Sequence, residues 1–592
     1  MWFHFMPSIL ALLLLCKGFY ATDCPIIGAA FPPPRALSRS STWKKAIDDF
    51  ESKLKDLLHQ STDLDANATS FSINIFSSYE DNLLYEYHHD APGLKGSISE
   101  GQKLNGDTMY RIASISKAVT VYTLLIEAGF NLFNYPIASL VPEIATAIMG
   151  EDMNTIPDDT LITQWKDITV GSLANYFNDM AGKVNQTVAA QLGLPVLSSS
   201  QTPRCGQKGP HFDPCTRRDM FAEFINHHPV FAPFSTAIYS NVAFDIMSYA
   251  VEEFTGVAFE KSVERSVIDP LKLKRFSIQT PPAVWGIIPF DPIISLWNAS
   301  LGSGGPAAGF YSSASDLARI GQSILRSDLI SETDTRRWLK PNSHTSSLVS
   351  SVGSPWEIYR ASNPRVIDFY TKFGDMGNYG SVIALSPDHN VGFTVLTAGT
   401  NSGSQRTILA DLIGSLLSAT LDREAKLQAV QDFAGIYSSL EIEDDKASVI
   451  KISDNKDDNG PGLAIDSFQL NGVQFKEIVG AFIGVPPGTF PEVGLRLQPT
   501  GLTARYPNSS PELVHSRAAF RVVMDIPEPG ANSNATREKI FSGVCRSWMA
   551  IDGLRYGRKS IDELVFELDG QRNAVAIDMR ITGQTLLRKQ GN

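Results

Sequence analysis

A serine and a lysine stand at a spacing that suits covalent catalysis. Ser114 and Lys117 lie three residues apart in the segment MYRIASISKAVTVYTLLIEAG. Residues three apart share one face of a helix, so the lysine can accept the serine proton where burial favours the neutral amine. The same S-x-x-K pattern starts at Ser41, Ser52, Ser448 and Ser453. Only the copy at Ser114 precedes an apolar run of helix length, so we expect the nucleophile there.

Two further segments carry complementary groups. In Y-x-N at Tyr239 to Asn241, a phenol near ammonium groups can relay a proton, and an amide can hold a carbonyl or a lysine. In K-x-G at Lys372 to Gly374, a strand lysine can attract a carboxylate, and glycine lets the Asp375 N–H approach an oxyanion. A chance tripeptide and a solvated strand-end lysine are the alternative interpretations.

The periodicity of apolar residues predicts the elements that must position these groups. Apolar residues three and four apart predict helices at 43–59, 114–129 and 242–255, the last ended by Gly256, while 71–78 alternates like a strand. Residues 365–398 form three β-rich runs separated by turn residues, and a long helix follows at about 404–434. Residues 435–592 contain many short alternating runs, which predict a separate antiparallel β domain, either a barrel or a sandwich.

The three motifs in this order resemble the penicillin-recognising serine hydrolases, and within them the class C β-lactamase and esterase branch. The runs GGPAAGFYSSASDLARIGQSIL (304–325) and GNYGSVIALSPDHNVGFTVLTAG (377–399) are also similar to that family. The resemblance covers residues 60–420, and a C-terminal β domain resembles that of fungal secreted members. It implies an α/β (α+β) domain with a central antiparallel sheet, flanking helices and a helical lobe.

The resemblance also implies a role for each motif residue. Ser114 would be the acylated nucleophile, Lys117 its general base, and Tyr239 the group that passes the proton to the leaving group. Asn241 and Lys372 would orient substrate. Gly374 would allow close approach, and the backbone N–H groups of Ser114 and Asp375 would form the oxyanion hole.

Three positions depart from the family pattern. Phe373 stands where members usually have threonine or a small residue, which argues against penicillin as the natural substrate. Asp375 replaces a small or neutral residue, and a carboxylate pointing inward would oppose anionic substrates and the oxyanion. The segment Ile168 to Gly182 resembles a stretch that ends in His-x-x-Gly in the family, but it contains no histidine.

The expected function is a secreted serine hydrolase that forms an acyl-enzyme and cleaves a small-molecule ester, amide or lactam. One alternative is an acyltransferase of secondary metabolism, and another is a catalytically silent ligand-binding member of the fold. The net charge of −12 disfavours nucleic acid as a partner. The chain has no G-x-S-x-G, H-E-x-x-H or C-x-x-C motif, so we expect no metal and no cofactor.

The N-terminus and the cysteines indicate the compartment. The apolar run 8–16 is too short to span a bilayer and predicts a signal peptide over 1–21, so we expect no membrane anchor. An extension over 22–45, a catalytic domain over 46–428 and the β domain over 435–592 would follow. We expect a Cys205–Cys215 bridge and, by subtraction, a Cys24–Cys545 bridge. Candidate glycosylation sites are Asn67, Asn185, Asn298, Asn508 and Asn534.

Overall fold

The computed structural model describes residues 26–60, 63–149, 158–174, 186–196, 198, 215–225, 227–362, 365–439, 446–453, 460–490, 493–505, 516–525 and 547–589. The predicted signal peptide (1–21), three of the paired cysteines and three of the glycosylation sites lie outside these residues: Cys24, Cys205, Cys545, Asn185, Asn508 and Asn534. The chain divides into two compact units. One comprises 35–361 with 368–417, and the other comprises 1–34, 362–367 and 418–592.

The larger unit contains an eight-stranded sheet in the order β2-β1-β11-β10-β9-β8-β7-β6. Its strands are β1 (Thr69–Ser77), β2 (Tyr85–His89), β6 (Ser343–His344), β7 (Ser350–Val352), β8 (Glu357–Ala361), β9 (Ile367–Met376), β10 (Tyr379–Ser386) and β11 (Val391–Gly399). The three runs expected within 365–398 are β9, β10 and β11, which pair antiparallel around short turns. The central antiparallel sheet predicted from the sequence is therefore confirmed.

Helices cover the sheet, because every residue of β1, β10 and β11 is buried and both faces of those strands must be covered. Helix α12 (Ala314–Arg326) packs on these three strands. Helix α2 (Ser41–Gln60) reaches the edge strand β2, where the Phe50 and Tyr85 rings meet at 5.3 Å. Helix α14 (Ser402–Phe433) follows β11 and corresponds to the long helix expected at 404–434.

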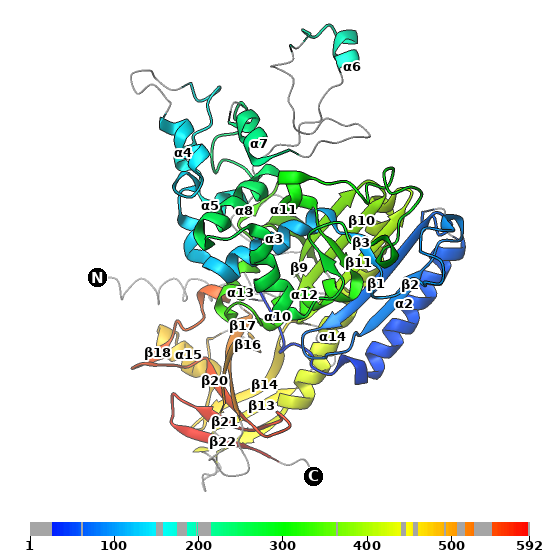
Figure 1. Ribbon diagram of the computed structural model, residues 1–592. Helices are drawn as coiled ribbons and strands as arrows, with labels where there is room; N and C mark the ends of the chain where they lie inside the picture. The colour runs from blue at the N-terminus through cyan, green and yellow to red at the C-terminus, as the bar shows by residue number, and fades with distance from the viewer. Residues whose placement is uncertain are drawn as a thin grey trace. The chain divides into compact units, whose positions relative to one another are not determined.

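A helical lobe stands beside the sheet in the same unit (Figure 1). Helix α3 (Ser116–Ala128) packs against α8 (Val242–Thr255) and the short α11 (Gly305–Ala308), and α5 (Val170–Ala174) packs on α8. Helix α8 ends as expected at Gly256, whose left-handed φ of 72° closes the last turn. This lobe buries aromatic and aliphatic side chains that form one core with the sheet.

The smaller unit is a closed β-barrel. Its strands are β12 (Gly435–Ser438), β13 (Val449–Ser453), β14 (Leu463–Leu470), β16 (Gly494–Arg505), β17 (Ser516–Asp525), β20 (Glu563–Leu568), β21 (Ala574–Met579) and β22 (Gln584–Arg588). They follow the order β13-β12-β22-β21-β20-β17-β16-β14, and pairing of β13 with β14 closes the ring. The rings of Phe433, Phe520 and Phe566 meet in its core at 4.9 to 5.1 Å. Of the two architectures left open by the sequence, the barrel is the one observed.

Candidate active site

Ser114 lies in a sharp turn between a strand and a helix. Strand β3 (Met109–Arg111) leads into one 3-10 turn (Ala113–Ile115), which continues as α3. Ala113 adopts a φ of 44°, an uncommon conformation for a residue with a side chain. The Ser381 hydroxyl donates to the Ile112 carbonyl at 2.8 Å and ties this turn to β10. The serine hydroxyl is thereby held at the junction between the helical lobe and the sheet.

Lys117 lies one turn further along α3 and is fully buried. Its Nζ donates to Ser114 Oγ at 3.0 Å, to Asn241 Oδ1 at 2.6 Å and to the Ala307 carbonyl at 2.9 Å. The amide and carbonyl oxygens can only accept hydrogen bonds. A neutral amine therefore keeps its two hydrogens on Asn241 and Ala307 and directs its lone pair at the serine hydroxyl. The arrangement suits a base that removes the serine proton.

Tyr239 completes what we call the helix side of the site, comprising Ser114, Lys117, Tyr239 and Asn241. Its hydroxyl donates to Ser114 Oγ at 2.6 Å. The Lys117 ammonium lies 4.9 Å from the centre of its ring, and the Lys372 ammonium lies 5.2 Å from it. The sequence-based expectation of a phenol between two ammonium groups corresponds to this geometry.

Segment 302–310 holds α3 in place through three hydrogen bonds. Besides the Ala307 carbonyl that accepts from Lys117, the Pro306 carbonyl accepts from Thr120 Oγ1 at 2.8 Å, and the Phe310 N–H donates to Ser116 Oγ at 3.1 Å. Pattern reasoning assigned no site role to Ala307. A backbone carbonyl carries no side-chain signal, and only the packing of α11 on α3 reveals it.

Strand β9 forms the opposite wall, where Gly374 touches the turn that contains Ser114. A Cβ at Gly374 would lie 2.3 Å from the Ile112 carbonyl oxygen and 2.8 Å from the Ser114 nitrogen. These distances exclude any side chain without a backbone shift, so the close approach expected for this glycine is present. Asp375, whose N–H was expected in the oxyanion hole, follows directly and pairs with Gly380 in the β9–β10 ladder.

Lys372, on the same strand, is bound by a carboxylate that pattern reasoning missed. Its Nζ lies 2.5 Å from Glu357 Oε1 on β8, and the other carboxylate oxygen accepts from the Phe373 N–H at 3.0 Å. The Lys372 side chain is 1% exposed and that of Glu357 is 24% exposed. No motif marks Glu357, because its position depends on which strand lies beside β9.

Asp375 is bound by a second missed residue, Arg406 on α14. The guanidinium Nη1 lies 2.9 Å from Oδ1 and 3.0 Å from Oδ2 of Asp375. The expectation that this carboxylate would oppose the oxyanion applies only to an inward orientation, and here the carboxylate is turned to Arg406. The sequence does contain a feature that could have indicated Arg406. A cation in the second turn of a helix lies near the positive end of the helix dipole, which is unfavourable unless an anion lies beside it.

Lys372, Gly374 and Asp375, together with Glu357 and Arg406, are called the strand side below. Phe373 lies between its residues, with the Arg406 guanidinium 4.5 Å from its ring centre and the Tyr359 ring at 5.8 Å. Burial first, and then the charge of Glu357, raise the pKa of Tyr359. Its hydroxyl therefore stays neutral at neutral pH.

The other predicted site residues are exposed, bonded elsewhere or outside the described residues. Cys215 is disulfide-bonded, but each cysteine that could pair with it lies outside those residues, so the Cys205–Cys215 pairing stays a prediction. Asn67 and Asn298 are exposed, as glycan attachment requires. Part of the Ile168 to Gly182 segment, residues 175–182, is outside the described residues.

The described part of the chain contains no group of histidine, cysteine and acidic side chains suited to a metal ion. In the same residues, no helix is both long and apolar enough to cross a bilayer.

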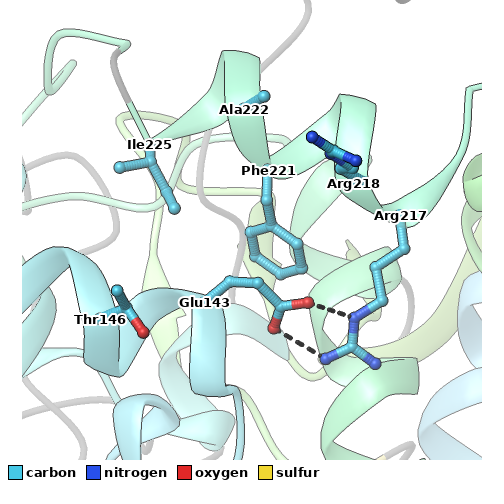
Figure 2. A pocket seen from close by; sticks show the side chains of 7 residues that line it. All are labelled: Glu143, Thr146, Arg217, Arg218, Phe221, Ala222 and Ile225. Carbon is cyan, nitrogen blue, oxygen red and sulfur yellow. Dashed lines mark hydrogen bonds and ion pairs between the residues drawn. The ribbon is translucent and has the colours of Figure 1, made fainter.

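A cavity of about 580 Å³ lies between α4 (Pro142–Met149) and α7 (Arg217–Phe224), and Ser114 is not among the residues that line it (Figure 2). Its lining consists of Glu143, Thr146, Arg217, Arg218, Phe221, Ala222 and Ile225. Arg217 Nε and Nη2 lie 2.7 and 2.9 Å from the two carboxylate oxygens of Glu143. The one carboxylate in the cavity lining is therefore paired with Arg217. The lining contains no residue of the S-x-x-K motif at Ser114 or of the Y-x-N motif at Tyr239.

Comparisons with known proteins identify the family of the chain. The profile described as "Beta-lactamase" matches residues 84–418, and one described as "Beta-lactamase-like-like, C-terminal domain" matches residues 425–590. A "Beta-lactamase-like protein" of Arthroderma benhamiae is 29% identical over 93% of each chain. A "Probable hydrolase clz13" of Cochliobolus lunatus is 25% identical over 96% of this chain and 91% of its own.

Among solved structures, a class C beta-lactamase mutant is 15% identical, covering 63% of this chain and 97% of its own, with a TM-score of 0.44. The "Beta-lactamase" profile spans more than half of the chain and includes Ser114, Tyr239 and strand β9. This chain therefore belongs to the beta-lactamase family.

Proposed function

We propose that this protein is a serine hydrolase that cleaves an ester or amide through an acyl-enzyme on Ser114. The observation that carries the proposal is that Ser114 Oγ lies within hydrogen-bond distance of two proton-transfer groups, Lys117 Nζ at 3.0 Å and Tyr239 OH at 2.6 Å. A serine hydroxyl is a weak nucleophile until a neighbouring base takes its proton. Family membership supports serine hydrolase chemistry in general.

The acylation step follows from these contacts. Ser114 Oγ forms a bond to the substrate carbonyl carbon while its proton passes to the Lys117 amine. The carbonyl oxygen becomes an oxyanion facing the backbone N–H groups of Ser114 and Asp375. The bond to the leaving group then breaks as the Tyr239 hydroxyl protonates it, and Tyr239 recovers a proton from Lys117. Water then attacks the acyl carbon with the same proton transfers. The bond to Ser114 Oγ breaks, the serine regains its proton and the acid is released.

Ser114→Ala tests the proposal. The wild type should react with a fluorophosphonate probe and hydrolyse p-nitrophenyl butyrate, and Ser114→Ala should do neither. Ser41→Ala is the matched control, because Ser41 opens a second S-x-x-K on the exposed surface of α2 and should keep both activities. Equal behaviour of the wild type and Ser114→Ala would instead support a silent binding protein. A new ester formed when an alcohol is added would identify acyl transfer.

Secretion is part of the same proposal. The short apolar run at 8–16 and the disulfide-bonded Cys215 both suit an exported protein. Expression with the native N-terminus should release into the culture medium a protein that begins near residue 22. Non-reducing peptide mapping of that protein should find a disulfide between Cys205 and Cys215. An intracellular product that retains residues 1–21 would contradict secretion.

A further inference from the structure

The strand side contains two buried cations, and each is bound by a carboxylate of the same chain. The Lys372 ammonium, 1% exposed, lies 2.5 Å from Glu357. The Arg406 guanidinium, 8% exposed, lies 2.9 Å from Asp375. Each pair sums to zero charge. The two cations best placed to receive an anionic substrate group on this wall are therefore already neutralised.

A substrate carboxylate would be repelled as well as attracted here. Placed near Lys372 it would also face Glu357, and placed near Arg406 it would also face Asp375. A second anion at a similar distance from the cation cancels most of the attraction that a bound anion would feel. The bound anion also loses its hydration, and that cost must be offset. Like charges brought together at such a site disfavour binding strongly.

The wall between the two ion pairs is aromatic. Phe373 lies between Lys372 and Gly374 in sequence, and its ring meets the Tyr359 ring at 5.8 Å and 80°, an edge-to-face arrangement. Phe373 is half-buried and Tyr359 is 47% exposed, so apolar ring surface is open to a ligand. The Arg406 guanidinium stacks on Phe373 at 4.5 Å and keeps that ring in place.

We propose that, given the hydrolase function above, this site selects uncharged acyl donors: esters with an apolar or aromatic group beside the end of β9 and no carboxylate there. Glu357 and Asp375 act as internal counter-ions that exclude anionic donors. Phe373 and Tyr359 bind the apolar group. Amides or lactams that bear a carboxylate near the scissile bond are poor substrates for the same reason.

Two matched ester pairs test the selectivity on both sides of the scissile bond. The acyl side is tested with p-nitrophenyl butyrate against the p-nitrophenyl monoester of succinate. The leaving-group side is tested with phenyl acetate against 4-carboxyphenyl acetate. Wild type should prefer the neutral ester in at least one pair by about tenfold or more in kcat/KM after correction for intrinsic reactivity.

Charge-removing variants identify the cause. Glu357→Gln and Asp375→Asn keep the side-chain shape, and each should lower that preference about fivefold or more by releasing its cation. Asp368→Asn is the matched control. It removes a carboxylate from β9, the strand of Asp375, where Asp368 pairs with Arg360 at 2.9 Å. It should leave the preference unchanged. Phe373→Ala should raise KM for phenyl acetate more than for ethyl acetate.

The outcomes separate this proposal from the proposed function. If Ser114 is labelled by the fluorophosphonate and neutral esters are cleaved, yet neither counter-ion variant changes the preference, the selectivity proposal is wrong and the hydrolase remains. If Ser114 is neither labelled nor required for cleavage, the hydrolase function is wrong and the selectivity proposal with it. Thermal melting of each variant shows whether it is folded. If only one of Glu357→Gln and Asp375→Asn folds, that variant alone is enough to test the selectivity proposal.

Discussion

The helix side and the strand side of the site use a buried lysine in different ways. Lys117 donates to three neutral oxygens, whereas Lys372 is held by the carboxylate of Glu357. Neutral acceptors favour the ammonium form of a lysine less than a carboxylate does. The first lysine is therefore suited to proton transfer, and the second forms an ion pair beside the ring of Tyr239.

The largest effect that this comparison predicts is for Lys117→Met. Acylation of Ser114 should fall roughly 1,000-fold, because the general base is lost while the apolar side chain still fills the buried space. Pre-steady-state release of p-nitrophenol measures this rate. Lys44→Met, which changes the lysine of the exposed S-x-x-K on α2, is the control and should acylate like wild type. An acylation rate within a few-fold of wild type for Lys117→Met would reverse the roles of the two lysines.

Gly374→Ala should have the next largest effect. A Cβ there would lie 2.8 Å from the Ser114 nitrogen, so β9 must shift away from the oxyanion position and kcat should fall about 100-fold. Gly414→Ala on α14 is the matched glycine control, since a Cβ there meets nothing within 4 Å. Steady-state kinetics with p-nitrophenyl butyrate compares the two variants. Equal kcat values would show that the strand side does not hold the oxyanion.

Lys372→Met should cost about tenfold in kcat/KM for a neutral ester, because it removes one of the two ammonium groups beside Tyr239. It also leaves the Glu357 carboxylate without its cation. The double variant Lys372→Met with Glu357→Gln should recover part of that activity, since no unpaired charge remains. If kcat/KM of the double variant is lower than that of both single variants, the Lys372–Glu357 pair acts through something other than charge.

The smallest effect concerns how α11 holds the helix side. Thr120→Val removes the bond to the Pro306 carbonyl, 2.8 Å long, without changing the side-chain volume. Losing one buried hydrogen bond should lower the free energy of unfolding by about 1 to 2 kcal/mol. Because Lys117 keeps its own bond to Ala307, kcat should change less than about threefold. Urea unfolding and steady-state kinetics measure the two quantities, and a large fall in kcat with unchanged stability would assign Thr120 a direct role.

The sequence predicted most of the helix side because its residues are close in the chain or belong to recognisable patterns. Ser114 and Lys117 are one turn apart, and α8 begins and ends where its apolar periodicity and Gly256 indicate. The barrel could not be chosen over a sandwich, since alternating strands are common to both. Closure depends on the pairing of β13 with β14, which no local pattern encodes.

Sequence alone predicted Ser114 as the nucleophile, Lys117 as its base and the order of the motifs, because helix geometry and residue chemistry act over a few positions. Only the tertiary structure decided the charge of the strand side. Glu357 reaches Lys372 across 15 residues and Arg406 reaches Asp375 across 31, through a neighbouring strand and a following helix. Ion pairing depends on separation in space, and the packing of strands and helices sets that separation.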